Sequence, residues 1–329
     1  LTAHGASEDF NKNCGLGQGS MLAPLKWKLF LDPLLKKLDK TGEPYKMGAG
    51  SNTAHIYAAA FADDLTVVAP THKDYVLRME LANKYLSFFG VELNAVKTTY
   101  TYANTGHHHH PINIWNRQTH TTAPSSVAAP TQALRYLGSW LSPSLRSKKG
   151  KTMLLASIHS ILNVLQYKKL DWKEYRYIIQ AVVESKAMYY LNVAPLTDAE
   201  LLSLDRRIAG QFKRTLKMAR STSSHILYLP ESQRGFALPS IKQRRDALLI
   251  RQAYRLLNDP GQLGKVFRTR LIDFKKVTGD TINPLNKPNT HKNLFNNHWF
   301  ARIAHVLHTN GHKITTTLDM STPTDRATD

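Results

Sequence analysis

The chain has 329 residues, of which 42% are hydrophobic, so it can bury a sizeable core and lacks the composition of a disordered protein. Its 44 lysines and arginines outnumber 24 aspartates and glutamates, and the net charge of +20 favours a polyanionic partner. The single cysteine, Cys14, excludes an intramolecular disulfide framework and zinc sites built from several thiolates. No apolar run approaches the roughly 18 residues of a transmembrane helix.

The first 150 residues predict two helices and several short strands. After a polar, glycine-rich start, leucines at helical spacing predict a helix at 24–40, and a second helix capped by Asp74 is expected at 74–89. Short strands at 56–62 and 65–69 flank Asp63 and Asp64. Residues 103–133, rich in Thr, Pro, Ala, Ser and His, read as a loop around one short strand. The remaining extended segments are expected at 91–102, 112–115 and 136–141.

From about residue 151 the pattern becomes helical almost throughout. The expected helices are 151–168, 172–192, 197–221, 239–258 and a weaker one at 262–276. This change places a domain boundary near residue 150. We therefore expect an α+β domain at 1–150, an all-α domain at 151–278 and a loosely ordered tail at 279–329 with one candidate helix near 294–309.

One expected helix separates its charges by face. Residues 201–276 contain 17 Lys or Arg and five Asp or Glu. An apolar stripe is predicted at Leu201, Leu204, Ile208, Phe212, Leu216 and Ala219. The opposite side carries the cations Arg206, Arg207, Lys213, Arg214, Lys217 and Arg220. Because solvated faces usually mix both signs, we interpret this face as a contact for nucleic-acid backbone, with plain solvation as the alternative. Membrane-surface binding is the weaker reading, since the apolar stripe resembles core.

The sharpest chemical feature is Phe61-Ala62-Asp63-Asp64, which places two carboxylates at the tip of a predicted hairpin. An Asp-rich turn without function is the simpler interpretation, because aspartate suits turns. The functional interpretation is a divalent-metal site, since hard oxygen ligands on a rigid strand end suit Mg²⁺. Two such ions can activate an attacking hydroxyl and stabilise a leaving phosphate oxygen.

Further motifs follow in a fixed order around this turn. The sequence contains Gly15-Leu16-Gly17-Gln18-Gly19-Ser20, Phe30-Leu31-Asp32-Pro33-Leu34, Phe89-Gly90-Val91-Glu92-Leu93-Asn94 with Lys97-Thr98, Tyr136-Leu137-Gly138, and Leu229-Pro230-Glu231 with Gly235-Phe236-Ala237-Leu238-Pro239-Ser240. Together with the acidic turn they resemble the reverse transcriptases of non-LTR retrotransposons over residues 10–245. The resemblance implies a partial polymerase palm, an antiparallel hairpin sheet with helices, followed by an all-α thumb.

The resemblance also assigns roles to individual positions. It implies that Asp63 binds metal with Asp64 assisting, that Lys97 lies near the incoming triphosphate, and that the cationic helix follows the template–primer backbone. Near the nucleotide and template it places Gly17, Gln18 and Gly19. The turn that supports the primer end is Tyr136, Leu137 and Gly138. Without the family, the glycines would be a flexible lead, Lys97 a solvated lysine and Tyr136 a buried strand anchor.

Several departures from the family pattern lower the polymerase activity that we expect from this chain. The family's first catalytic carboxylate lies upstream of the Gly-Gln segment, and Glu8 and Asp9 are too close to that segment to match it. The chain starts at Leu1 without a visible leader, so we expect a fragment that lacks the fingers and that carboxylate. Ala23 stands where the family more often has serine. Neither endonuclease type of the family is visible.

Histidines and tyrosines elsewhere read as structural. The run His107 to His110 is expected in a polar loop rather than a metal site. We favour an amphipathic helix over a zinc cluster for His298, His305, His308 and His312. Packing between thumb helices, rather than base stacking, is expected for Tyr175, Tyr177, Tyr189 and Tyr190.

The leading hypothesis is therefore an incomplete RNA-directed DNA polymerase, weak or inactive by itself. The intact enzyme would extend a DNA primer 3′-hydroxyl on an RNA template, using deoxynucleoside triphosphates and Mg²⁺ or Mn²⁺. Its partners would be an RNA–DNA hybrid and nucleotides, with no membrane, and the resemblance implies an intracellular, nuclear location. The alternative is a catalytically dead remnant that only binds nucleic acid through its basic face. A Mg²⁺-dependent nuclease using Asp63 and Asp64 is a remote third reading.

Overall fold

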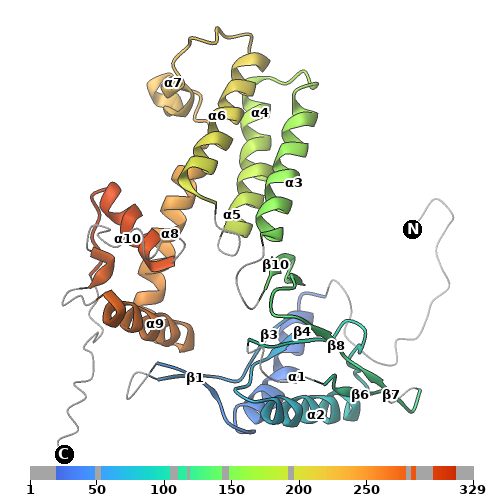
Figure 1. The fold of residues 1–329 in the computed structure, drawn as a ribbon. Coiled ribbons are helices and arrows are strands. Elements are labelled where there is room, and N and C mark those ends of the chain that lie inside the picture. The colour runs from blue at the N-terminus through green and yellow to red at the C-terminus, as the bar shows by residue number, and fades with distance from the viewer. Residues whose placement is uncertain are drawn as a thin grey trace, which may run out of the picture. The chain divides into compact units, whose positions relative to one another are not determined.

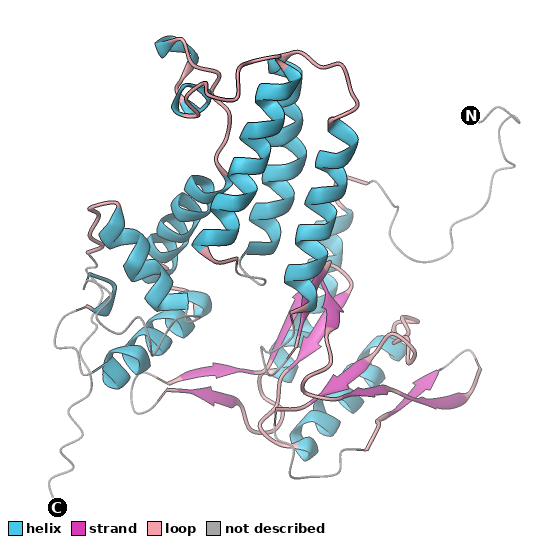
Figure 2. Ribbon diagram, turned by 45° about the horizontal axis from the view of Figure 1, so that its top comes forward, coloured by secondary structure: helices cyan, strands magenta, loops and turns pink. Residues whose placement is uncertain are grey.

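The computed structural model describes residues 20–48, 53–103, 110–116, 119–142, 148–191, 196–278, 283–286 and 299–315. Helices dominate and the strands are short, which confirms the α+β class (Figures 1 and 2). Two compact units are present. Unit 1 comprises Leu1–Lys46, His55–Tyr100 and His109–Val127, and unit 2 comprises Met47–Ala54, Thr101–His108 and Ala128–Asp329. The residues just before the expected boundary at 150 thus group with the helices of unit 2.

Unit 1 is built on two helices and one hairpin. Helix α1 (Ala23–Leu38) has Pro24 in its first turn, and α2 (His72–Phe88) begins after Thr71. The hairpin consists of β3 (Ala58–Phe61) and β4 (Asp64–Val67), and its small and apolar residues pack against both helices. The buried residues of this core are Leu31, Leu34, Leu38, Ala82 and Leu86.

The start of α2 differs from the expectation in one detail. Thr71, not Asp74, is the N-cap residue, and its hydroxyl accepts a hydrogen bond from the Asp74 backbone N–H at 3.1 Å. Asp74 lies in the first turn, where its carboxylate is buried and accepts hydrogen bonds from the Thr71 hydroxyl and the Glu43 N–H. Its role is therefore to hold the segment before the hairpin to α2.

The remaining strands of the N-terminal half form further two-stranded pairs. Strand β6 (Asn113–Asn116) pairs antiparallel with β7 (Thr121–Pro124). Strand β1 (Tyr45–Met47) pairs with β2 (Ala54–Ile56), and β5 (Thr99–Thr101) pairs with β8 (Ser126–Ala128). The segment 103–133 was expected to hold one strand, and its described residues contain three: β6 and β7 pair with each other, and β8 pairs with β5. Its threonines and alternating apolar residues favour strands despite the low-complexity composition.

Unit 2 opens with a hairpin of β9 (Leu134–Tyr136) and β10 (Ser139–Leu141). The single strand expected at 136–141 is wrong, because Leu137 and Gly138 adopt φ values of 45° and 78° and turn the chain back. Three long helical segments follow side by side in Figure 1: α3 (Lys149–Leu165), the continuous α4 (Trp172–Ile178), η2 (Ile179–Glu184) and α5 (Ser185–Leu191), and α6 (Asp198–Thr215). Their shared core includes Tyr175 and Phe212.

A second core in unit 2 joins α8 (Ile241–Leu257), α9 (Gln262–Thr278), the 3₁₀ turn η4 (Pro284–Asn286) and α10 (Trp299–Thr309). Between α6 and α8 the chain forms α7 (His225–Tyr228) and the 3₁₀ turn η3 (Glu231–Gln233), and Leu227 of α7 is buried in the first core. Helix α10 falls within the candidate helix expected near 294–309, and its Phe300, Ile303 and Leu307 are buried against this core. None of the described helices combines the length and apolarity needed to cross a membrane.

Candidate functional site

The acidic turn lies at the tip of the β3–β4 hairpin. Phe61 pairs with Asp64 across the ladder, so Ala62 and Asp63 form a two-residue turn. Ala62 has φ of 51°, in the left-handed region that costs a non-glycine residue roughly 1 kcal/mol. Strain of this kind persists only where surrounding structure enforces it, and it is common in functional turns.

Both carboxylates of the turn are free to bind a cation. The side chains of Asp63 and Asp64 are exposed, and within the described residues neither carboxylate accepts a hydrogen bond or forms an ion pair. The donor set of this pair suits Mg²⁺, which accepts carboxylate oxygens together with water and phosphate oxygens. No cluster of three or more His, Cys, Asp or Glu suited to a metal occurs in the described part of the chain. Two carboxylates by themselves supply only part of the coordination that Mg²⁺ requires.

The turn is anchored by residues that the motif analysis overlooked. The Trp27 indole N–H of α1 donates to the carbonyl of Ala62 at 2.5 Å, one residue before Asp63. Below the hairpin, the fully buried Arg78 of α2 donates to the carbonyl of Val68, which directly follows β4. The only features of the sequence that could have pointed to these anchors were the Trp27 indole on an otherwise apolar helix face and the position of Arg78 among the buried residues of α2. Neither distinguishes an anchor from a surface residue.

Lys97 lies in unit 1 with the acidic turn. Its side chain is exposed, and its backbone N–H donates to the Asn94 side chain at 3.0 Å, which forms a local turn before β5. The extended segment expected at 91–102 is therefore interrupted, because the Asn94 side chain offers the backbone a competing hydrogen bond. Gly17, Gln18 and Gly19 lie outside the described residues.

The turn assigned to primer support belongs to unit 2. Tyr136 ends β9, and Leu137 and Gly138 form the turn itself. Two hydroxyls of α5 donate to this turn: that of Tyr189 to the carbonyl of Leu137, and that of Tyr190 to the carbonyl of Gly138 at 2.6 Å. Sequence reasoning assigned these tyrosines only to helix packing, which fits Tyr175 but misses their hydroxyl contacts.

The cationic face of α6 is present but smaller than expected. The helix ends at Thr215 instead of continuing to residue 221, and Lys217 adopts φ of 54° in the following turn. Because the chain turns back here, Lys213 is buried and its ammonium donates to the carbonyls of Arg220 and Thr222. The exposed cations are Arg206, Arg207, Arg214, Lys217 and Arg220, which we call the cationic face.

Nearby carboxylates do not neutralise this face. Asp205, on the opposite side of α6, is buried and accepts hydrogen bonds from the Ser240 hydroxyl and the first N–H groups of α8, at Ile241 and Lys242. Burial raises the pKa of Asp205, although these hydrogen bonds oppose the shift. Asp198 is paired with Arg245 at 2.5 Å. Within the described residues, no ion pair involves any member of the cationic face.

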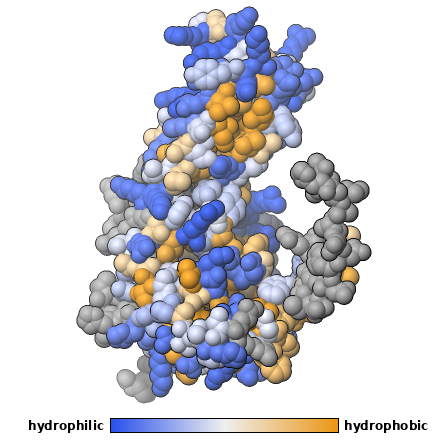
Figure 3. Space-filling view, turned by 90° about the vertical axis from the view of Figure 1, so that its right-hand side faces the viewer, coloured by the Kyte–Doolittle hydropathy of each residue, from blue (hydrophilic) through white to orange (hydrophobic). Residues whose placement is uncertain are grey.

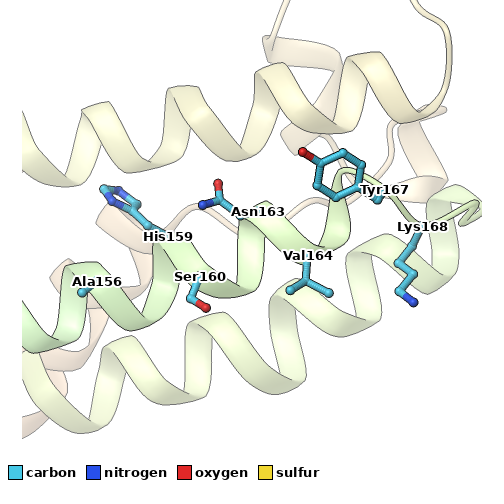
Figure 4. Close-up of a pocket in the computed structure, with 7 residues that line it drawn as sticks. All are labelled: Ala156, His159, Ser160, Asn163, Val164, Tyr167 and Lys168. Atoms are coloured by element: carbon cyan, nitrogen blue, oxygen red, sulfur yellow. The ribbon is translucent and has the colours of Figure 1, made fainter.

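A shallow hollow of about 530 Å³ follows the outer side of α3. Figure 4 shows that its residues come from successive turns of α3 and from Tyr167 and Lys168 just after that helix, with His159 and Asn163 directed toward one neighbouring helix and Val164 toward another. Arg207 of the cationic face donates to the Asn163 side chain at 2.8 Å, so the two features adjoin. Apolar side chains gather on the helical part of the face in Figure 3, and Val164 and Tyr167 are exposed hydrophobic residues at the end of α3.

The histidines do not form a metal site in the described part of the chain. His305 lies on α10 with its Nε2 3.6 Å from an Asp198 carboxylate oxygen, and His308 and His312 are exposed. His107 and His298 lie outside the described residues. The helical placement of His305 and His308 agrees with the amphipathic interpretation.

Comparisons with known proteins agree with this reading of the motifs. Residues 2–141 match the family described as reverse transcriptase (RNA-dependent DNA polymerase). Over 249 residues the chain is 24% identical to the retrovirus-related Pol polyprotein from the type-2 retrotransposable element R2DM of Drosophila melanogaster. This stretch covers 75% of the chain and 23% of the relative, so the chain spans about a quarter of that protein's length. Over residues 2–141 the chain belongs to the reverse transcriptase family, and it is a partial relative of the reverse transcriptases of non-LTR retrotransposons.

Proposed function

We propose that this chain supplies part of the active site of an RNA-directed DNA polymerase, which extends a primer 3′-hydroxyl on an RNA template. The observation that carries this proposal is the exposed, unpaired Asp63–Asp64 pair on an anchored hairpin, inside the segment that matches the family. The substrates would be an RNA–DNA hybrid and deoxynucleoside triphosphates.

In this proposal, acidic residues would hold the metal, a lysine would lie near the phosphates and small residues would line the nucleotide site. Asp63 would hold Mg²⁺ or Mn²⁺ through its carboxylate, with Asp64 beside it, and such ions lower the pKa of the attacking hydroxyl and stabilise the leaving oxygen. Lys97 would offset negative charge on the departing pyrophosphate, and Gly17, Gln18 and Gly19 would shape the nucleotide site. Since the candidate metal-binding carboxylates among the described residues come from the β3–β4 hairpin only, we expect low polymerase activity from this chain by itself.

The test combines extension with metal mapping. A 5′-labelled DNA primer on an RNA template is incubated with the chain, nucleotides and Mg²⁺, with D63N as the inactivating variant and D39N, at an exposed aspartate ending α1, as the matched control. In parallel, Mg²⁺ is replaced by Fe²⁺ with ascorbate and peroxide, which cleaves the polypeptide near bound iron. We expect cleavage near residue 63 that D63N abolishes and D39N preserves. Extension or cleavage unchanged in D63N would refute the role of Asp63.

A second candidate function is nucleic-acid binding without catalysis. The observation favouring it is the cationic face, whose five side chains are exposed while Asp205 and Asp198 are engaged elsewhere. Basic groups without ion-pair partners can contact phosphates at no cost in broken salt bridges, and each phosphate contact adds about one to the salt dependence of binding.

This function is tested by comparing two triple variants of equal charge. R206E/R214E/K217E changes the cationic face, and K265E/R270E/K276E changes exposed cations of α9. Binding to an RNA–DNA hybrid is measured by anisotropy across a salt series. We expect the first variant to reduce the slope of log affinity against log salt by about two to three and the second to change it by less than about one. Equal effects would indicate a long-range charge effect and no localised interface.

A further inference from the structure

The turn between β9 and β10 depends on support from outside the hairpin. Leu137 and Gly138 both have positive φ, as a tight hairpin turn requires, and leucine is strained in this region. The turn also leaves two carbonyl oxygens directed away from the ladder. These are the two oxygens that receive the hydroxyls of Tyr189 and Tyr190.

The two tyrosines form a clamp on this turn, which we call the tyrosine clamp (Tyr189 and Tyr190). Their rings lie edge to face with centroids 5.6 Å apart, and they reach successive residues of the turn. A Cβ placed on Gly138 would lie 3.6 Å from the Tyr189 hydroxyl oxygen, so the ring packs directly on the glycine. The clamp therefore fixes the turn through both hydrogen bonds and van der Waals contact.

The helix that carries the clamp is itself fixed. Ala187 and Leu191 of α5 are buried in the core shared with α3 and α6. Before α5 the helix widens into the π segment η2, Ile179–Glu184, and a widened turn changes the direction in which every later side chain points. The π segment thus determines which side of α5 faces the hairpin.

A second contact holds the same hairpin to the bundle. The Lys149 ammonium of α3 lies 3.5 Å from the centre of the Trp140 ring on β10, a cation–π contact. The hairpin, α3 and α5 all belong to unit 2. The turn at Leu137 and Gly138 is consequently fastened to α3 and α5, which share a core with α6, the helix that carries most of the cationic face.

We propose that Tyr189 and Tyr190 are positioning residues for the primer terminus. This inference rests on the proposed function together with the role that the family resemblance implies for Tyr136, Leu137 and Gly138, which is support of the primer end. By fastening that turn to α5, the clamp would make the placement of the primer 3′ end depend on the same compact unit that carries the cationic face. Removing the hydroxyls should misplace the primer end without weakening backbone contact.

The test separates placement from affinity. Y189F/Y190F removes both hydroxyls and keeps the rings, and Y177F, at an exposed tyrosine of α4, is the matched control. Each protein is titrated onto an RNA–DNA hybrid with 2-aminopurine at the primer 3′ end. Anisotropy reports total binding, 2-aminopurine fluorescence reports the surroundings of the terminus, and hydrogen exchange reports opening of residues 134–141.

We expect Y189F/Y190F to bind within about twofold of the wild type, with an unchanged salt slope. Exchange at residues 134–141 should accelerate about tenfold or more, because each lost hydrogen bond contributes about 1 kcal/mol. The fluorescence response of the terminus should fall to less than half, while Y177F matches the wild type throughout.

Two outcomes overturn the inference in different ways. If the wild-type chain changes 2-aminopurine fluorescence and Y189F/Y190F changes it equally, the tyrosines are structural only, whatever the exchange rates show. If the wild-type chain binds the hybrid but leaves the fluorescence unchanged, the primer-support role of the turn fails and the inference fails with it. Faster hydrogen exchange in α6 would show that Y189F/Y190F destabilises unit 2 as a whole. In that case the single variants Y189F and Y190F are compared with the wild type by 2-aminopurine fluorescence, and an unchanged response would overturn the positioning role.

Discussion

Arg78 is the most consequential buried side chain of unit 1. It has no exposed surface, and its guanidinium donates to three backbone carbonyls: Thr41 at 2.8 Å, Glu43 at 2.6 Å and Val68 at 2.6 Å. The same group lies 5.0 Å from the centre of the Tyr57 ring. One side chain of α2 therefore holds both the segment after α1 and the exit of the acidic hairpin.

Replacing Arg78 by methionine keeps an apolar stem of similar length and removes all three donors. Each buried carbonyl left without a donor costs about 1–3 kcal/mol, part of which water entry or small shifts recover. We expect a net loss of about 3–5 kcal/mol in the stability of unit 1, and a 4 kcal/mol loss corresponds to a roughly 700-fold increase in opening. R78K should lose less, since lysine keeps the charge but cannot span three acceptors.

Hydrogen exchange is the appropriate assay because the chain has two units and a single unfolding midpoint would mix them. Peptides from α2 report unit 1 and peptides from α6 report unit 2. K84M, at an exposed lysine of α2, removes the same charge and should shift stability by less than about 0.5 kcal/mol. If the opening free energy of α2 from hydrogen exchange in R78M lies within 1 kcal/mol of the wild-type value, the three hydrogen bonds do not anchor unit 1 as argued.

Three further predictions concern single positions. G235A should cost about 2–3 kcal/mol because its Cβ would meet the Leu229 carbonyl oxygen at 2.1 Å, whereas G210A, with open space on α6, should stabilise by about 0.5–1 kcal/mol; denaturant unfolding distinguishes them. D205A strips the start of α8 of its acceptor and should cost about 2–4 kcal/mol, read as faster exchange in α8; no change would contradict the capping role. The Thr71 hydroxyl and the Glu43 N–H lower the pKa of Asp74, so the contribution of this carboxylate to stability is present above the unfolded pKa of about 3.9 and is lost as pH falls through the lower folded pKa. D74N should therefore reduce the loss of stability at acid pH in a series of unfolding measurements, and an unchanged loss would contradict this role.

Much of the chain's organisation could be predicted without coordinates because it depends on local patterns. Helical spacing of apolar residues located α1, α3 and α8 to within a few residues, and the order of motifs around Asp63 and Asp64 identified the family. Where local hydrogen bonds compete with the pattern, prediction was less accurate. Asn94 interrupts an expected strand, and the early end of α6 buries Lys213, because a side chain can satisfy backbone groups in ways that hydrophobic spacing does not reveal.

By itself, the sequence determined which residue types face the core, where charge accumulates and which turn carries paired carboxylates, since these follow from spacing and composition. Only the tertiary structure decided what holds those features in place. Trp27 reaches Ala62 across 35 positions, Arg78 reaches Thr41 across 37, and Tyr189 and Tyr190 reach the hairpin turn across 52. Such contacts join one donor to one distant carbonyl, and every backbone residue offers a carbonyl. Which carbonyl a given donor reaches is therefore determined by packing, which brings particular helices beside particular turns.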